Sequence, residues 1–177
     1  MGLVARVAHL VAASPTAASG GPPQPADLCD DTSTAAPILV VPVTDRPLPF
    51  LGLDFLYVPS RDVAADRASF TDVLGGRVIF AVQVMGTRVA AIQLTEGPPL
   101  VLLAEHLEGD RPILVYRVAD LGTAMAELEA RGWQRQQVLE IPQGPCCSFR
   151  TSGGHRIAVY QLTRPEVAAH LEGRRDF

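Results

Sequence analysis

The chain has 177 residues, of which 47% are hydrophobic and 19% charged, and its formal net charge is −4. This length is enough for one domain with its own core, and a mildly acidic chain without a basic cluster argues against nucleic acid or an anionic membrane as a partner. No apolar run approaches the roughly 20 residues of a membrane span, so we expect a soluble globular domain.

The basic residues and the cysteines add two expectations. All 15 basic residues are Arg and the chain has no Lys or Asn, which indicates a GC-rich bacterial genome and excludes a lysine Schiff base or general base. The cysteines are Cys29 and the adjacent pair Cys146 and Cys147. They match neither a disulfide framework nor a zinc spacing, which favours a reducing, cytoplasmic environment. In the pair, we expect one side chain to face inward and the other outward.

Residues 1–50 differ in composition from the rest of the chain. They hold eight of the 15 prolines, which remove backbone donors and block helix interiors, so we expect a mostly disordered tail or linker. A short apolar run at 38–41 could add an edge strand. The apolar stretch near the start is too short for a signal-peptide core, and a native tail and a mis-called start codon both stay open.

From residue 51 onward the pattern predicts a β-α-β-β-β unit that occurs twice. The first unit, 53–106, has predicted strands at 53–58, 77–84, 88–94 and 100–105 and a helix at 63–74. The second unit, 112–163, has predicted strands at 112–118, 133–141, 146–151 and 156–162 and a helix at 121–130. Gly and Pro at the junctions supply the turn conformations, and a short helix at 165–172 follows.

An internal repeat supports this division. Setting Asp62 on Asp120 gives an offset of 58 residues that brings corresponding helices and strands together. Each Asp stands directly before a predicted helix, where its side chain can accept a hydrogen bond from a backbone N–H of the first turn. We therefore predict that both are N-caps rather than catalytic residues.

The module order and several short motifs resemble the vicinal oxygen chelate superfamily, which includes glyoxalase I, extradiol dioxygenases and bleomycin-resistance proteins. The motifs are Asp-Val or Asp-Leu at the helix starts, Leu-Glu-Ala-Arg-Gly-Trp at 128–133 and Gly-His-Arg-Ile-Ala-Val-Tyr at 154–160. The resemblance implies an α+β, glyoxalase-like domain over residues 51–177, in which both modules form one cup-shaped mixed sheet with the ligand inside. A homodimer is expected by analogy only.

Metal-dependent members of the superfamily carry His, Gln or Glu ligands on the first and last strand of each module. The corresponding positions here are Phe55, Leu102, Ile113 and Ala158. Because apolar side chains offer no donors, we predict no metal centre of the family type and no cofactor, with a divalent metal at displaced ligands as the alternative.

Three histidines and one glutamate could substitute for those ligands. His106 and Glu105 are the best remaining candidates for metal binding or acid–base chemistry, but adjacent strand residues point to opposite faces. We therefore expect a solvated strand end there. His155, in a predicted hairpin turn, and His170, on the last predicted helix, are expected at the surface.

Alternation along the strands predicts which side chains face the cup. The predicted ligand-binding residues are Phe55, Tyr57, Leu102, Arg117 and Tyr160, an apolar set with a few polar groups, as in many small-molecule pockets. Arg117 lies in an otherwise apolar strand, so it either meets an acidic partner or awaits an anionic or planar ligand. No catalytic residue is identified.

Two hypotheses of different classes follow. The first is a metal-free binding module that holds a small hydrophobic or aromatic molecule, as the bleomycin-resistance proteins do. The alternative is an enzyme of the same superfamily, a lyase, isomerase or dioxygenase type with non-standard or no metal ligands. A purely structural domain with a collapsed cup is a third possibility, and the volume of the interior distinguishes it from the other two.

Overall fold

The computed structural model of the protein describes residues 49–84 and 86–177. The predicted N-terminal tail, except for its last two residues, and the possible strand at 38–41 lie outside the described residues.

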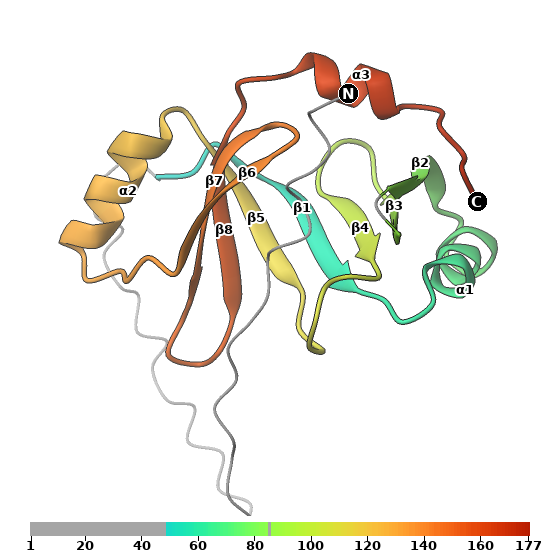
Figure 1. Ribbon diagram of the computed structural model, residues 1–177, viewed down its shortest axis with the longest axis horizontal. Helices are drawn as coiled ribbons and strands as arrows, with labels where there is room; N and C mark the ends of the chain where they lie inside the picture. Colours follow the sequence, from blue (N-terminus) through green and yellow to red (C-terminus); the bar gives the residue numbers. More distant parts are fainter. Residues whose placement is uncertain (1–48, 85) are drawn as a thin grey trace, which may run out of the picture. The chain divides into compact units, whose positions relative to one another are not determined.

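Within the described residues the two predicted modules are present (Figure 1). Module one comprises β1 (Gly52–Pro59), α1 (Val63–Ala68), the π-helical turn η2 (Ser69–Val73), β2 (Arg77–Val84), β3 (Thr87–Gln93) and β4 (Leu100–Ala104). Module two comprises β5 (Ile113–Val118), α2 (Leu121–Ala130), β6 (Gln137–Ile141), β7 (Gly144–Arg150) and β8 (Arg156–Gln161), and α3 (Glu166–Leu171) follows it.

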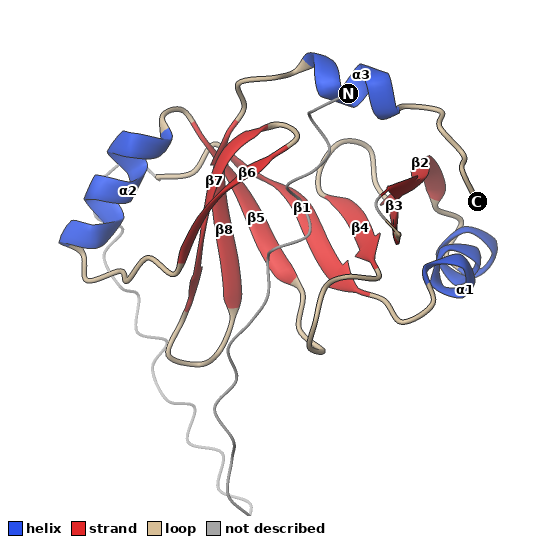
Figure 2. Ribbon diagram, in the orientation of Figure 1, coloured by secondary structure: helices blue, strands red, loops and turns tan. Residues whose placement is uncertain are grey.

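The strands of the described residues form one eight-stranded sheet in the order β2-β3-β4-β1-β5-β8-β7-β6 (Figure 2). The modules meet at its centre, where β1 and β5 run antiparallel. The pairs β1–β4 and β5–β8, which flank this seam, are parallel, and the other neighbours are antiparallel. The predicted mixed sheet of two tandem modules is therefore confirmed, with β2 and β6 at its edges.

Both predicted N-caps are present, and the helices begin 58 residues apart, at Val63 and Leu121, as the repeat predicts. The Asp62 carboxylate accepts hydrogen bonds from two backbone N–H groups of the first turn of α1, and the Asp120 carboxylate accepts one from Thr123. That backbone hydrogen bond lowers the pKa of Asp120. No helix in the described part of the chain is long and apolar enough to cross a membrane.

The strand predicted from residue 133 begins later, at Gln137. The end of α2 explains the difference. Gly132 has a φ of 88°, and the N–H groups of Gly132 and Trp133 donate to the carbonyls of Glu129 and Leu128. This is a Schellman motif, which uses the residues just after a helix to satisfy its last carbonyls. Residue 133 therefore belongs to the helix cap rather than to a strand.

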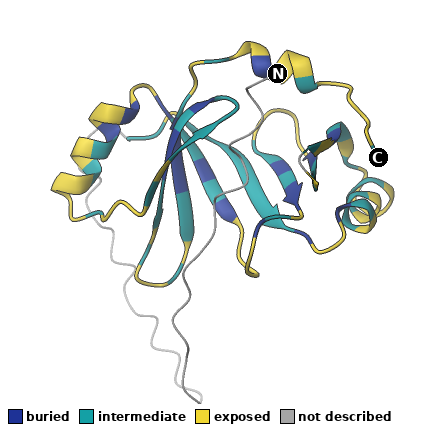
Figure 3. Ribbon diagram, in the orientation of Figure 1, coloured by how far each residue is buried: buried dark blue, intermediate teal, exposed yellow. Residues whose placement is uncertain are grey.

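Alternate strand residues face opposite sides of the sheet and build separate cores. On one side α1 and α2 pack on the sheet through two clusters, which include Leu103 and Val159 respectively. On the other side lies a third cluster that includes Ala158. Cys146 belongs to this third cluster and Cys147 to the cluster beneath α2, so the pair faces opposite ways as expected. Both cysteines are buried, because the outer one, Cys147, packs in one cluster with Leu121 and Ala124 of α2. In Figure 3 most buried residues lie on the strands, and the exposed ones lie mostly on helices and loops.

Candidate functional site

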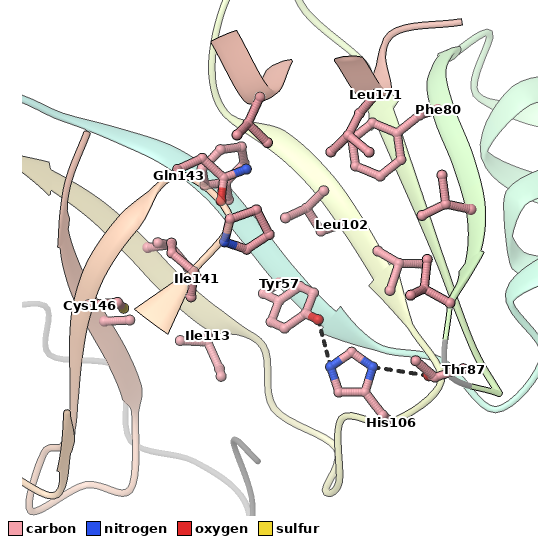
Figure 4. A pocket seen from close by; sticks show the side chains of 18 of the residues that line it. Tyr57, Phe80, Thr87, Leu102, His106, Ile113, Ile141, Gln143, Cys146 and Leu171 are labelled. Carbon is pink, nitrogen blue, oxygen red and sulfur yellow. Dashed lines mark hydrogen bonds between the residues drawn. The ribbon is translucent and has the colours of Figure 1, made fainter. Parts of the chain in front are cut away.

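A cavity of about 450 Å³ lies on the sheet face opposite α1 and α2. Side chains from all eight strands of the sheet and from α3 line it, so both modules form its walls (Figure 4). Most of these side chains are aliphatic or aromatic. Cavities of roughly 300–1,000 Å³ with such a lining are typical of small-molecule sites. A domain with a collapsed interior therefore does not describe this structure.

The four positions at which the superfamily would carry metal ligands share this cavity. Leu102 on β4 and Ile113 on β5 are both register partners of the same β1 residue, Tyr57, and Phe55 and Ala158 face the cavity from β1 and β8. None of these four side chains has an N, O or S donor, so the residues present do not fit a divalent metal at this place. Elsewhere in the described ranges, His, Cys, Asp and Glu side chains form no group of three or more that could hold a metal ion.

A chain of three hydrogen-bonded side chains is the main polar feature inside the cavity. The Tyr57 hydroxyl lies 2.7 Å from His106 Nε2, and His106 Nδ1 lies 3.1 Å from Thr87 Oγ1 (Figure 4). Burial raises the pKa of Tyr57 and lowers the pKa of His106. The phenol is therefore protonated and the imidazole neutral at neutral pH. We assign Tyr57 as the donor to Nε2, which leaves the ring proton on Nδ1 to be donated to Thr87.

The expectation of a solvated strand end was wrong for His106, which lines the cavity. Its neighbour Glu105 is exposed and accepts a hydrogen bond from the backbone N–H of Arg88, so the two residues do point to opposite faces. The sequence did carry a signal for His106. Leu102 lines the cavity, and Ala104 belongs to the third cluster on the same face of the sheet. Counting on by two residues along the strand reaches position 106, just beyond the end of β4, on this same face.

Two of the predicted ligand-binding residues, Arg117 and Tyr160, lie in a polar cluster with Asp54 and are not among the residues that line the cavity. The Tyr160 hydroxyl donates to Asp54 Oδ2 at 2.5 Å, and Arg117 Nε lies 3.4 Å from the same oxygen. Tyr160 is 2% exposed, and burial together with the Asp54 carboxylate raises its pKa. Of the two alternatives for Arg117, the structure thus supplies the acidic partner. Phe55, Tyr57 and Leu102 do line the cavity, and their role in binding stays a prediction.

The Cys146 thiol also lines the cavity, but its environment makes it unreactive. Burial raises the pKa of Cys146 to about 12, and a thiol is a nucleophile only as the thiolate. Cys146 is therefore part of the apolar wall at neutral pH rather than a candidate nucleophile.

The buried His106 makes the stability of the protein depend on pH. Because burial lowers its pKa in the folded state below the unfolded value of 6.5, the unfolded chain binds a proton here first as the pH falls. We expect the free energy of unfolding to decrease as the pH falls from about 6.5 toward the lowered pKa. Urea unfolding of the wild type and of His106→Gln between about pH 7.5 and pH 5 measures this contribution, which the variant should lack. His155→Gln, at an exposed hairpin position, is the control and should keep it; equal pH dependence in all three proteins would contradict the assignment.

Comparisons with known proteins agree with this fold. No protein-family model matches the sequence, and no curated protein matches it significantly. Among solved structures, methylmalonyl-CoA epimerase from Mycobacterium tuberculosis is similar, with 18% sequence identity, a TM-score of 0.57, and coverage of 68% of this chain and 93% of that one. A selenomethionine-labelled methylmalonyl-CoA epimerase has 15% identity, a TM-score of 0.56, and coverage of 67% and 100%. A Streptomyces coelicolor epimerase variant in complex with 2-nitronate-propionyl-CoA has 14% identity, a TM-score of 0.54, and coverage of 64% and 96%.

The chain thus has the fold of the vicinal oxygen chelate superfamily, as the resemblance predicts. At these identities the likeness extends to the fold, and the activity has to be argued from the cavity itself.

Proposed function

We propose that the protein binds a small, neutral, largely apolar molecule in the cavity, without a metal ion at the superfamily's ligand positions. One observation carries the proposal: Phe55, Leu102, Ile113 and Ala158 form part of the wall of an apolar cavity of about 450 Å³. In this proposal the protein is a binding module for a hydrophobic or aromatic molecule.

The distribution of charge supports a neutral ligand. Apart from His106, the charged or basic residues that line the cavity are Glu166, His170 and Arg174, and all three are exposed. Inside, Tyr57 is a protonated phenol and His106 a neutral imidazole. A carboxylate or ammonium group placed among the apolar side chains would lose its hydration without gaining a counter-charge. Charged molecules should therefore bind more weakly than neutral molecules of the same shape.

One polar atom on the ligand has a partner in the cavity. The Tyr57 oxygen, which donates its proton to His106, can still accept a hydrogen bond. A hydroxyl or amide N–H on an otherwise apolar ligand can donate to it while the rest of the molecule contacts the aliphatic wall. Aromatic alcohols, phenols and amides are therefore the class that we expect to bind best.

Calorimetry and thermal-shift measurements test the proposal. A panel of neutral aromatic alcohols and amides is compared with carboxylate and ammonium analogues of the same skeletons, in buffer with a chelator and with added zinc, manganese or nickel. We expect saturable binding of neutral members that is unchanged by chelator. Binding that requires a divalent metal, or the absence of binding across the panel and with the neutral dye Nile red, would contradict the proposal.

An isomerase or lyase is the second candidate function, and it is favoured by the fold of the epimerases and by the Tyr57–His106–Thr87 chain. In this candidate the ligand is a small carbonyl compound, such as a thioester. The Tyr57 hydroxyl turns from His106 to donate its hydrogen bond to this carbonyl oxygen. His106 Nε2, whose lone pair is then free, takes the proton from the adjacent carbon and returns it to that carbon or its neighbour. The proton count is conserved, and the reaction needs no oxidant.

Proton exchange separates the two functions. In D₂O, an isomerase of this kind exchanges the hydrogen beside the carbonyl of a bound ketone or thioester, which nuclear magnetic resonance detects. His106→Gln should abolish the exchange, whereas Glu105→Gln, which changes the exposed neighbour, should leave it intact. Binding without exchange supports the binding module alone.

A further inference from the structure

Each side chain of the Tyr57–His106–Thr87 chain can both donate and accept a hydrogen bond. The phenol and the Thr87 hydroxyl each have one proton and free lone pairs, and a neutral imidazole has one N–H and one bare ring nitrogen. The contacts of 2.7 Å between Tyr57 and His106 Nε2, and of 3.1 Å between His106 Nδ1 and Thr87, fix the places of the heavy atoms (Figure 4). They leave open the direction in which the protons are donated.

Two proton orders fit the same heavy atoms. In the first order Tyr57 donates to Nε2 and the Nδ1–H donates to Thr87. In the second order Thr87 donates to Nδ1, the Nε2–H donates to the Tyr57 oxygen, and the Tyr57 proton is free for a ligand. To pass from one to the other, the ring loses its proton on Nδ1 and gains one on Nε2, by exchange with water, and the two hydroxyl protons rotate. Both orders therefore hold the same number of protons.

Neither end of this chain is held by a group that selects one order. Within the described ranges, no carboxylate, guanidinium or backbone group is hydrogen-bonded to the side chain of Tyr57, His106 or Thr87. The carboxylate next in sequence, that of Glu105, is exposed and accepts the backbone N–H of Arg88. A carboxylate on Nδ1 would hold the ring proton there. A threonine hydroxyl can rotate from acceptor to donor, so it holds neither tautomer permanently.

We infer that the polar chain reverses its proton order to match the ligand, so that the cavity binds neutral ketones, aldehydes and esters as well as alcohols and phenols. A ligand hydroxyl donates to the Tyr57 oxygen in the first order, and a ligand carbonyl oxygen accepts the Tyr57 proton in the second. This inference rests on the proposed function, because it concerns the polar atom of the same ligand. In the second order Nε2 carries a proton and cannot take one from carbon, so this order serves binding and not isomerisation.

Three compounds with one skeleton test the inference: benzhydrol has a hydroxyl, benzophenone a carbonyl, and diphenylmethane no polar group. The tautomer of His106 is read by nuclear magnetic resonance of protein with isotope-labelled histidine, with His106→Gln to assign the signal. We expect benzhydrol and diphenylmethane to leave the ring proton on Nδ1, and saturating benzophenone to raise the ratio of Nε2–H to Nδ1–H about tenfold. Calorimetry should give benzhydrol and benzophenone dissociation constants within about tenfold of each other.

Thr87→Val tests the chain without a ligand. Valine removes the acceptor of the Nδ1–H, and a buried N–H without an acceptor is tolerated less well than a bare acceptor. The ratio of Nε2–H to Nδ1–H should therefore rise about fivefold, and the affinity for benzophenone relative to benzhydrol by about the same factor. Valine suits a strand, so the fold should be kept. Thr87→Ser, which restores the hydroxyl, and Thr123→Val, at an exposed position of α2, should both keep the wild-type ratio.

These measurements separate the reversible chain from the proposed function. If benzophenone binds and the ring proton stays on Nδ1, or if benzhydrol binds and benzophenone does not, the inference is overturned while the binding proposal stands. An unchanged tautomer in Thr87→Val also overturns the inference. If none of the three compounds binds but Thr87→Val changes the tautomer, the binding proposal fails for this class of compound and the reversible chain is supported.

Discussion

Leu102→Trp is expected to weaken binding of neutral aromatic ligands by about 100-fold, which corresponds to roughly 3 kcal/mol. Leu102 lies on β4 beside Tyr57 and faces the middle of the cavity (Figure 4). An indole at this position occupies space that a ligand would fill and covers the route to the Tyr57 hydroxyl. Because the new ring enters an existing cavity rather than a filled core, we expect the free energy of unfolding to change by no more than about 1 kcal/mol.

Val138→Trp is the matched control for this prediction. It makes a similar aliphatic-to-indole change on edge strand β6, where Val138 is 55% exposed and does not line the cavity. Titration calorimetry with the best neutral ligand of the panel, together with urea unfolding, separates the two effects. Undiminished affinity in Leu102→Trp, or an equal loss in both variants, would show that the ligand binds elsewhere.

The tandem modules and the apolar ligand positions could be predicted from the sequence because both depend on local periodicity. The offset that sets Asp62 on Asp120 fixes corresponding residues in the two modules, and strand alternation then places Phe55 and Ala158 on one face of the sheet. These signals need only the period of two and the repeat length. The same repeat and alternation locate the four positions at which the superfamily carries metal ligands, and all four hold apolar residues in this sequence.

The rest of the site depends on contacts that periodicity does not encode. His106 lies beyond the last residue of β4, where alternation is no longer guaranteed, and it meets Tyr57 only because β1 and β4 pair in parallel. The short helix predicted at 165–172 is present as α3, but the chain after it pairs with β2, and this pairing joins residues more than 90 positions apart. Such long-range pairing depends on the packed structure as a whole.

The acidic partner of Arg117, Asp54, could not be predicted from the sequence for a related reason. Strict alternation would place Asp54 on the face opposite Phe55, away from Tyr160. The register between β1 and β5 shifts between Leu53 and Phe55, so that Asp54 is an extra residue in β1. A β-bulge of this kind re-aims a side chain, and both Asp54 and Phe55 reach Tyr160. The bulge thus gives Arg117 an ion-pair partner, Asp54, whose carboxylate also accepts the hydrogen bond of Tyr160.

Asp54→Ala is expected to lower the free energy of unfolding by about 2–3 kcal/mol. The change leaves the buried Tyr160 hydroxyl without its acceptor, which accounts for most of the loss. It also removes the counter-ion of Arg117, but this side chain is 37% exposed, so solvent reduces that contribution. Asp54→Asn, which keeps an acceptor for Tyr160, should cost about 1 kcal/mol.

A double-mutant cycle with Tyr160→Phe, measured by urea unfolding, isolates the Asp54–Tyr160 interaction. In the Tyr160→Phe background there is no hydroxyl, so Asp54→Ala no longer leaves a buried hydroxyl without an acceptor. The double variant should therefore be more stable, by about 1 kcal/mol or more, than the sum of the two single losses predicts. Strict additivity would contradict the coupling.

Ligand affinity supplies the second readout. Because the cluster does not line the cavity, Arg117→Ala should lower the free energy of unfolding and leave the binding affinity within about twofold of the wild type. Loss of binding would instead show that Arg117 contacts the ligand.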